Sequence, residues 1–105
     1  MGFVRKYACH RVYDAPDHYF PQSVVSIDEN GKTLGHALLT EETSSTEWIG
    51  GIIILTGQKE LPTFRNFHDL QRVLTKDPTC TYAWHISCFD FQNNELMPES
   101  IIRRL

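Results

Sequence analysis

The chain has 105 residues, of which 41% are hydrophobic and 22% are charged, a composition typical of folded rather than disordered proteins. A chain of this length supports one hydrophobic core, but it is too short for two domains. The formal net charge is −3 and the basic residues are scattered, so no field attracts a polyanion and we expect no nucleic-acid partner.

The sequence shows no pattern of an exported or membrane-spanning protein. Arg5 and Lys6 interrupt the first apolar residues, unlike a secretory signal. The aliphatic run Ile52–Leu55 is far shorter than the ~18 residues that a membrane span needs. Cys9, Cys80 and Cys88 have no short paired spacing, which indicates reduced and mainly buried thiols. We therefore expect a soluble cytoplasmic protein without a membrane partner.

The first third of the chain predicts three strands. Aromatic and β-branched residues indicate a strand over residues 3–13, and residues 15–22 are expected to form a loop. Asn30-Gly31, between two apolar runs, predicts a hairpin with a two-residue type I′ turn. Alternation places Val25 and Ile27 on one face of the first arm, and Leu34, His36 and Leu38 on one face of the second.

A polar connection, residues 41–47, leads into the sequence WIGGIIIL, residues 48–55. This segment has no polar alternation, so it is predicted to be the core strand, covered on both faces. Gly50 and Gly51 indicate a bulge, or the close approach of another backbone or a large ring such as Trp48. We expect Gly51→Val to destabilise the fold by more than about 1 kcal/mol, because the position is crowded.

One helix is predicted after the core strand. Phe64, Phe67, Leu70 and Leu74 recur at spacings of three and four, which is typical of an amphipathic helix. Thr63 is the expected N-cap of this helix. Pro78 is expected to end it, with Lys76 in its last turn complementing the helix dipole.

The remaining residues predict a second hairpin. It consists of a strand from Tyr82 to Phe91, a turn at Asn93-Asn94 and a short arm at Leu96-Met97, followed by a helical turn from about Glu99. The apolar residues change parity near Cys88, where a bulge or strong twist is expected. The fold class is therefore α+β: one domain over residues 1–105, a mainly antiparallel sheet or small β-sandwich of hairpins with one amphipathic helix.

Motifs that carry chemistry are missing from the sequence. The five histidines form no HxH, HxxxH or HExxH pair, the serines lack a GxSxG elbow, and no glycine-rich phosphate loop is present. We therefore expect no catalytic, cofactor-binding or metal-binding residue and no cofactor.

Two alternatives remain open. A small metal-dependent hydrolase would assemble its site from His10, His36 or His85 with Asp90. A small-ligand binding module would line a pocket with its large aromatic residues Trp48, Trp84 and Tyr82.

A resemblance bears on the role of the double glycine. The run VVSIDENGKTLGHALL, a polar link and IGGIIILTGQ together resemble the N-terminal β-segment of metal-dependent amidohydrolases, and HISCFDFQNNEL is similar to the hairpin that completes the same composite domain. In that family the apolar strand ends in an HxH that binds metal. Thr56 and Gln58 stand at the two histidine positions, and neither is a credible ligand for a hydrolytic zinc.

The resemblance implies the composite β-sandwich domain alone. About 20 residues replace a catalytic barrel of ~250 residues, so the reaction machinery is absent. We therefore expect a non-catalytic domain with a structural or protein-interaction role, which associates with itself or with a protein partner to cover its sheet edges.

Overall fold

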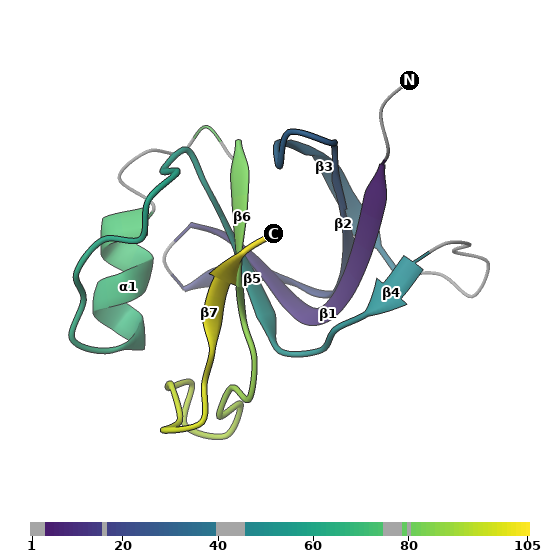
Figure 1. Cartoon of the computed structure of the whole chain (residues 1–105). Helices are drawn as coiled ribbons and strands as arrows, with labels where there is room; N and C mark the ends of the chain where they lie inside the picture. Colours follow the sequence, from purple (N-terminus) through teal and green to yellow (C-terminus); the bar gives the residue numbers. More distant parts are fainter. Residues whose placement is uncertain (1–3, 16, 40–45, 75–78, 80) are drawn as a thin grey trace.

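A strongly curved β-sheet with a single helix on its outer side dominates the molecule (Figure 1). The computed structural model describes residues 4–15, 17–39, 46–74, 79 and 81–105. These residues form one mixed sheet of seven strands and one α-helix. The β-rich α+β class is thus confirmed, but the strands belong to one continuous sheet rather than to the two sheets of a sandwich.

The strand order is β3-β2-β1-β5-β6-β7, and β4 also pairs with β1. Strand β1 is parallel to β4 and β5, whereas every other pair is antiparallel, so the mainly antiparallel prediction is right. The bounds are β1 Arg5–Ala15, β2 His18–Ile27, β3 Thr33–Leu38, β4 Thr46–Trp48, β5 Ile52–Thr56, α1 Phe67–Leu74, β6 Tyr82–Ile86 and β7 Ile102–Arg104.

The predicted loop over residues 15–22 is wrong. Its residues from His18 onward form the first half of β2, which pairs with the second half of β1. Strand β3 pairs with β2 only from Ser23, so the first half of β2 lies at a sheet edge. Edge strands tolerate exposed polar side chains and a residue such as Pro21. Because these residues break the apolar alternation, the sequence pattern did not indicate a strand.

The hairpin predicted around Asn30-Gly31, β2–β3, is confirmed, but its turn is not type I′. Gly31 alone in this turn has a positive φ, of 81°, and its N–H donates to the Asp28 carbonyl at 3.1 Å. The Asp28 carboxylate also accepts hydrogen bonds from the N–H groups of Asn30 and Lys32. This pattern is typical of a type I turn followed by a left-handed glycine.

The double glycine forms a bulge between β4 and β5, as one of the two predicted options requires. Both strands run along the same side of β1, pairing Trp48 with Ala8 and Ile52 with Arg11. Between these two pairs lie two residues of β1 but three residues of the segment that joins β4 to β5. The joining segment therefore has one extra residue. Beyond the bulge, every residue of β5 is buried, which confirms β5 as the core strand.

Apolar residues pack on both faces of the sheet. Because Val25 on β2 packs with Ile53 on β5, although β1 separates these strands, the sheet must curl around this cluster. The curl brings the start of β3 to β6, where the Thr33 N–H donates to the Thr81 carbonyl at 2.7 Å. Helix α1 covers the other face through a cluster of Tyr13, Ile52, Ile54, Phe67, Leu70, Leu74, Trp84, Ile86 and Phe89.

Helix α1 is shorter than predicted and has a different cap. It begins at Phe67, and the side chain of Asn66 accepts a hydrogen bond from the Asp69 N–H at 2.8 Å, which makes Asn66 the N-cap in place of Thr63. Phe64, which the spacing placed inside the helix, precedes it and packs against the helix-side cluster. Pro78 and Lys76 lie outside the described residues.

Replacing Asn66 by Ala should lower the free energy of unfolding by about 1 kcal/mol, because the Asp69 N–H loses its acceptor at the first helical turn. Thr63→Ala should change it by less than about 0.5 kcal/mol, because Thr63 precedes the helix by several residues. Urea denaturation of the two variants measures both losses and shows which residue is the N-cap. Equal losses would contradict Asn66 as the N-cap.

The C-terminal quarter differs most from the prediction. The strand from Tyr82 ends at Ile86, and the chain reaches Phe91 through Cys88, which has a positive φ of 52°. This left-handed residue accounts for the predicted change of parity, because Phe89 joins the same cluster as Ile86. A small turn, closed by a bridge between Asp90 and Glu95, includes the predicted turn residues Asn93-Asn94, but Leu96-Met97 form no strand.

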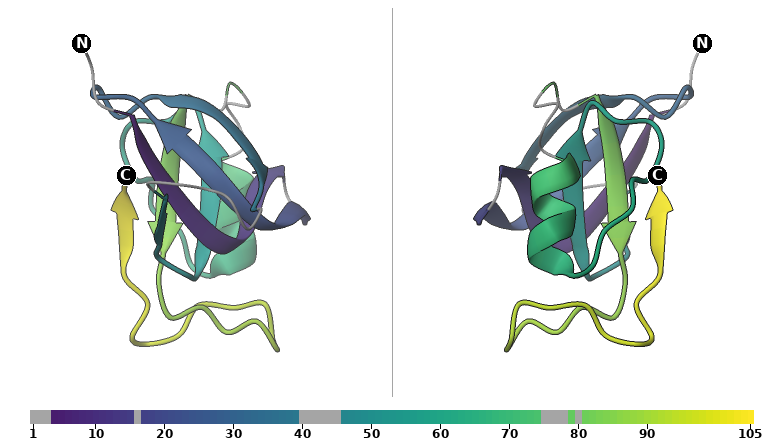
Figure 2. Two further views of the ribbon diagram at one scale, coloured as in Figure 1. Left: turned by 90° about the vertical axis from the view of Figure 1, so that its right-hand side faces the viewer. Right: turned by 90° about the vertical axis from the view of Figure 1, so that its left-hand side faces the viewer.

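The predicted C-terminal helical turn is wrong, because residues 102–104 form strand β7, paired with β6. Figure 2 shows that the connection from β6 to β7 extends beyond the end of the sheet before it returns. Over so short a segment, the pattern of polar and apolar residues does not separate a helical turn from an edge strand.

The described cysteines occupy different environments. Cys9 is buried, its thiol donates to the Arg11 carbonyl, and burial raises its pKa to about 12. Cys88 is exposed, which contradicts the expected burial, and Cys80 lies outside the described residues. Among the described residues, no helix is long and apolar enough to cross a bilayer.

Candidate functional site

The residues proposed for a metal site each make other contacts. The ring of His10 contacts Trp48 and Phe91, with centroids 4.9 and 4.8 Å apart, and His36 packs against Phe20. Asp90 caps its own turn, where hydrogen bonds from Asn93 lower the pKa of its carboxyl group. Within the described ranges, no group of three or more His, Cys, Asp or Glu side chains is arranged to hold a metal ion.

His85 is the buried member of this set. Its Nε2 lies 3.0 Å from the Gly50 carbonyl oxygen, so the ring fastens β6 to the glycine bulge. Burial, together with repulsion from Arg103, lowers the pKa of His85, against the opposing effect of its bond to Gly50. The structure therefore assigns His85 a role in packing the bulge.

Because the pKa of His85 is lowered in the folded chain, the stability of the protein should depend on pH. Below about pH 6.5 the unfolded chain protonates this ring while the folded chain does not, so His85 contributes stability above that pH and the contribution is lost as the pH falls. Thermal melts from pH 7.5 to 5 should show a shallower loss of stability for His85→Gln, whose amide still donates to Gly50. An unchanged slope would contradict the prediction.

Trp48, Trp84 and Tyr82, the aromatic residues proposed for a ligand pocket, line none of the cavities found among the described residues. Trp84 is 7% exposed in the helix-side cluster, and its indole N–H donates to the Gln58 carbonyl. Tyr82 lies against the Arg104 guanidinium, and Trp48 is half exposed beside His10. These three residues therefore have separate structural contacts.

Thr56 and Gln58, which the expected amidohydrolase resemblance would place at its histidine positions, bind the end of the helix. The Thr56 hydroxyl donates to the Leu74 carbonyl, and the Gln58 side-chain amide donates to the Val73 carbonyl. The last carbonyl groups of a helix have no N–H donor within the helix, and these two side chains supply the missing donors. The two positions thus join strand β5 to helix α1.

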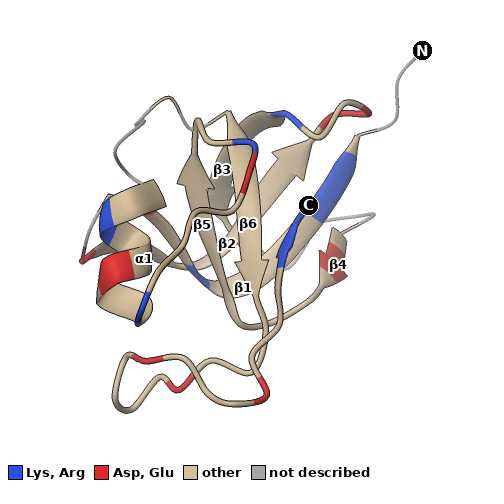
Figure 3. Ribbon diagram, turned by 60° about the vertical axis from the view of Figure 1, so that its left-hand side comes forward, with Lys and Arg blue, Asp and Glu red and all other residues tan. Residues whose placement is uncertain are grey.

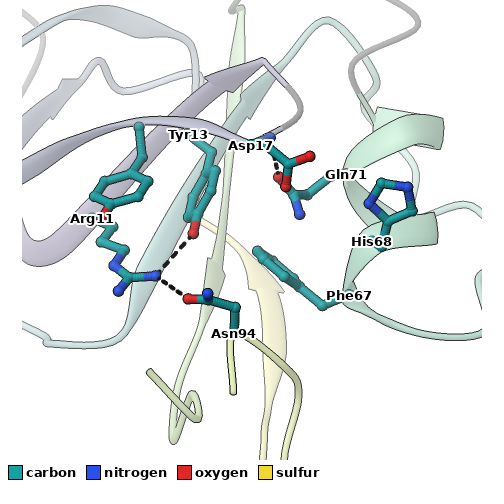
Figure 4. Close-up of a pocket in the computed structure, with 8 residues that line it drawn as sticks. Arg11, Tyr13, Asp17, Phe67, His68, Gln71 and Asn94 are labelled. Carbon is teal, nitrogen blue, oxygen red and sulfur yellow. Dashed lines mark hydrogen bonds between the residues drawn. The ribbon is translucent and has the colours of Figure 1, made fainter. Parts of the chain in front are cut away.

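A cavity of about 390 Å³ lies elsewhere, between the β1–β2 hairpin, helix α1 and the turn at residues 91–94 (Figure 4). This volume is within the range of small-molecule sites. We call it the hairpin–helix cavity. Its lining residues are Arg11, Tyr13, Asp17, Tyr19, Phe67, His68, Gln71 and Asn94.

Arg11 is held firmly at one side of the cavity. Its Nη1 donates to the Asn94 side-chain oxygen at 2.6 Å and to the Tyr13 hydroxyl at 3.2 Å. Its guanidinium carbon lies 4.5 Å from the centre of the Tyr19 ring and 5.0 Å from that of Phe91. The cation is therefore oriented by hydrogen bonds and flanked by aromatic rings.

Tyr13 forms the wall between the strand and the helix. Its ring packs edge-on against Phe67 and lies tilted against Tyr19, its partner across the hairpin. Burial raises the pKa of its phenol, against the opposing hydrogen bond from Arg11. The hydroxyl thus stays protonated and can donate to an acceptor in the cavity.

The helix and the hairpin turn complete the site. The backbone N–H of Asp17 donates to the Gln71 side-chain oxygen at 2.8 Å, which fixes the turn against α1. Asp17 has a positive φ of 58°, a conformation in which Asp is over-represented. Figure 4 shows Asp17 and Arg11 on opposite sides of the Tyr13 ring, so the cavity carries both charges at separate places.

Arg11 has no carboxylate partner within the described part of the chain. The ion pairs found there join Asp14 to His18 and Asp69 to Arg65 and Arg72. An oriented guanidinium beside a cavity, with a phenol and two amides around it, is suited to bind an oxygen-rich small molecule.

Sequence reasoning missed this site because the strand that supplies Tyr19 was predicted to be a loop. Arg11 and Tyr13 alternate along β1, which was a usable signal that both point to one face. The contribution of Asn94 depends on a turn that brings it back to β1, 83 residues away in the chain, and no local pattern predicts that contact.

No family model, curated protein or solved structure matches this chain.

Proposed function

We propose that this protein is a non-catalytic binding domain that holds a small polar organic molecule in the hairpin–helix cavity. The observation that supports this proposal is that side chains from three distant segments converge on the hairpin–helix cavity. Strand residue Arg11, helix residue His68 and turn residue Asn94 all line it. Convergent polar groups around aromatic walls are the usual composition of a ligand site.

Thermal melts across a panel of small polar metabolites test the proposal, because a ligand that binds only the folded chain raises its melting temperature. We expect hits whose NMR shift changes gather at residues 11–19, 67–71 and 94. Tyr19→Ala should abolish the response. Phe20→Ala is the matched control, because it removes the neighbouring ring, which packs with His18 and His36 instead of lining the cavity. Shift changes only elsewhere would refute the proposal.

Self-association is a second candidate, favoured by strand β3 at the end of the sheet. The sequence of β3, Thr33–Leu38, has no charged residue, and Leu34 and Leu38 are 57% and 64% exposed. At the opposite edge, β7 carries Arg103 and Arg104, drawn blue in Figure 3, and charged edges resist strand pairing. An uncharged edge with exposed leucines is suited to pair with a second copy.

Size-exclusion chromatography with light scattering tests this candidate. We expect a dimer that becomes monomeric when Leu34 and Leu38 are both replaced by Lys. Lysine at Met97 and Ile101, two exposed apolar residues outside β3, should leave the dimer intact. A parent chain that is monomeric at high concentration would rule the candidate out.

A further inference from the structure

We propose that Arg11 recognises a carboxylate in the hairpin–helix cavity, and that Asp17 makes the site selective for monocarboxylates over ligands of higher negative charge. The proposal rests on the proposed function and adds the chemistry of the ligand.

The first step concerns the free donors of Arg11. The hydrogen bonds to Tyr13 and Asn94 both use Nη1, and within the described residues no hydrogen bond uses Nε or Nη2. A guanidinium presents parallel N–H groups that match the two oxygens of a carboxylate. Because Asn94 and the flanking rings already fix the side chain, binding an anion costs little side-chain entropy.

The second step concerns the charge that the rest of the ligand carries. Asp17 lines the same cavity, and no ion pair in the described part of the chain neutralises it. A dianion bound at Arg11 would bring its second charge into the field of this carboxylate, and like charges repel in a partly enclosed site. A neutral or cationic remainder is therefore preferred to a second carboxylate, and the doubly charged group of a phosphate ester is disfavoured by the same field.

The third step concerns the body of the ligand. Tyr13, Tyr19 and Phe67 contribute rings to the cavity, and aromatic side chains prefer edge-on or offset contacts with another ring. An aromatic monocarboxylate therefore fits both the charge and the walls. Benzoate is the simplest probe of this class, with benzamide as its neutral analogue and phenyl phosphate as its dianionic one.

Calorimetric titration of the full chain with these three probes tests the proposal. We expect benzoate to bind at least about tenfold more tightly than either analogue, and Arg11→Gln to remove that preference. Arg11→Lys keeps the charge but loses the paired donors, so it should retain only part of the preference. Asp17→Asn should strengthen the binding of phenyl phosphate more than that of benzoate. The Asp17 side chain makes no hydrogen bond in the described structure, so this variant remains informative if Arg11→Gln fails to fold.

The outcomes separate the two proposals. If benzamide binds as tightly as benzoate, the cavity binds ligands but the role of Arg11 is overturned. If none of the probes binds while other polar molecules give shift changes at residues 11–19, the carboxylate proposal fails and the binding function stands. Phenyl phosphate that binds as well as benzoate, with no change on Asp17→Asn, would overturn the selectivity.

Discussion

Gly51→Ala should destabilise the fold by about 3 kcal/mol or more, the largest effect expected of a single added methyl group in this protein. A Cβ at this position would lie 2.1 Å from the carbonyl oxygen of Ile86 and 3.3 Å from Nε2 of His85. The contact is with backbone, which cannot rotate away, so β6 would have to move at its last residue, where Ile86 pairs with Ile52 of β5. Gly51 also has a φ of 61°, which costs an L-residue about 1–2 kcal/mol.

The neighbouring Gly50 provides a matched control. Its φ of 66° imposes nearly the same backbone strain, but a Cβ there would meet only the rings of His10 and Trp48 at 3.7 Å, an ordinary contact distance. Gly50→Ala should therefore lose only about 1–2 kcal/mol. Urea denaturation of both variants measures the two losses of stability, and their difference gives the free-energy cost of the clash with Ile86. Equal losses would show that β6 can move aside without destabilising the fold.

The sequence predicted the core of this fold better than its edges. Ile52 to Leu55 have no polar alternation because both sheet faces around β5 are buried, and that pattern is local. The glycine bulge was also predictable, since two adjacent glycines in an aliphatic strand seldom serve packing alone. By contrast, the first half of β2 and strand β7 have mostly exposed side chains, so their pairing leaves no periodic trace.

The candidate site was less predictable than the fold. Its parts depend on three contacts between distant segments: Arg11 with Asn94, Asp17 with Gln71, and Tyr13 with Phe67. Each residue alone is ordinary, and its chemistry arises only where the hairpin, the helix and the turn meet. The histidines drew attention because of their residue type, but in the described part of the chain they join no group of three side chains that could hold a metal ion.

The link between Thr56 and helix α1 gives the second large effect. Thr56 is fully buried, and its hydroxyl donates to the Leu74 carbonyl while it accepts the Gln58 N–H at 3.1 Å. Thr56→Val keeps the shape but leaves both groups without this partner, so we expect a loss of about 2–3 kcal/mol. The Gln58 side-chain amide, 3.4 Å from the Leu74 oxygen, compensates only in part.

Thr56→Ser is the matched control, because it keeps the hydroxyl and removes one buried methyl group, a loss of about 1 kcal/mol. Urea denaturation should therefore rank Val as more destabilising than Ser, the reverse of the order that apolar burial alone gives. Hydrogen exchange should locate the effect, with faster exchange at the amides of residues 67–74 in the Val variant than in the Ser variant. If Val is tolerated as well as Ser, packing rather than the hydroxyl holds the helix to β5.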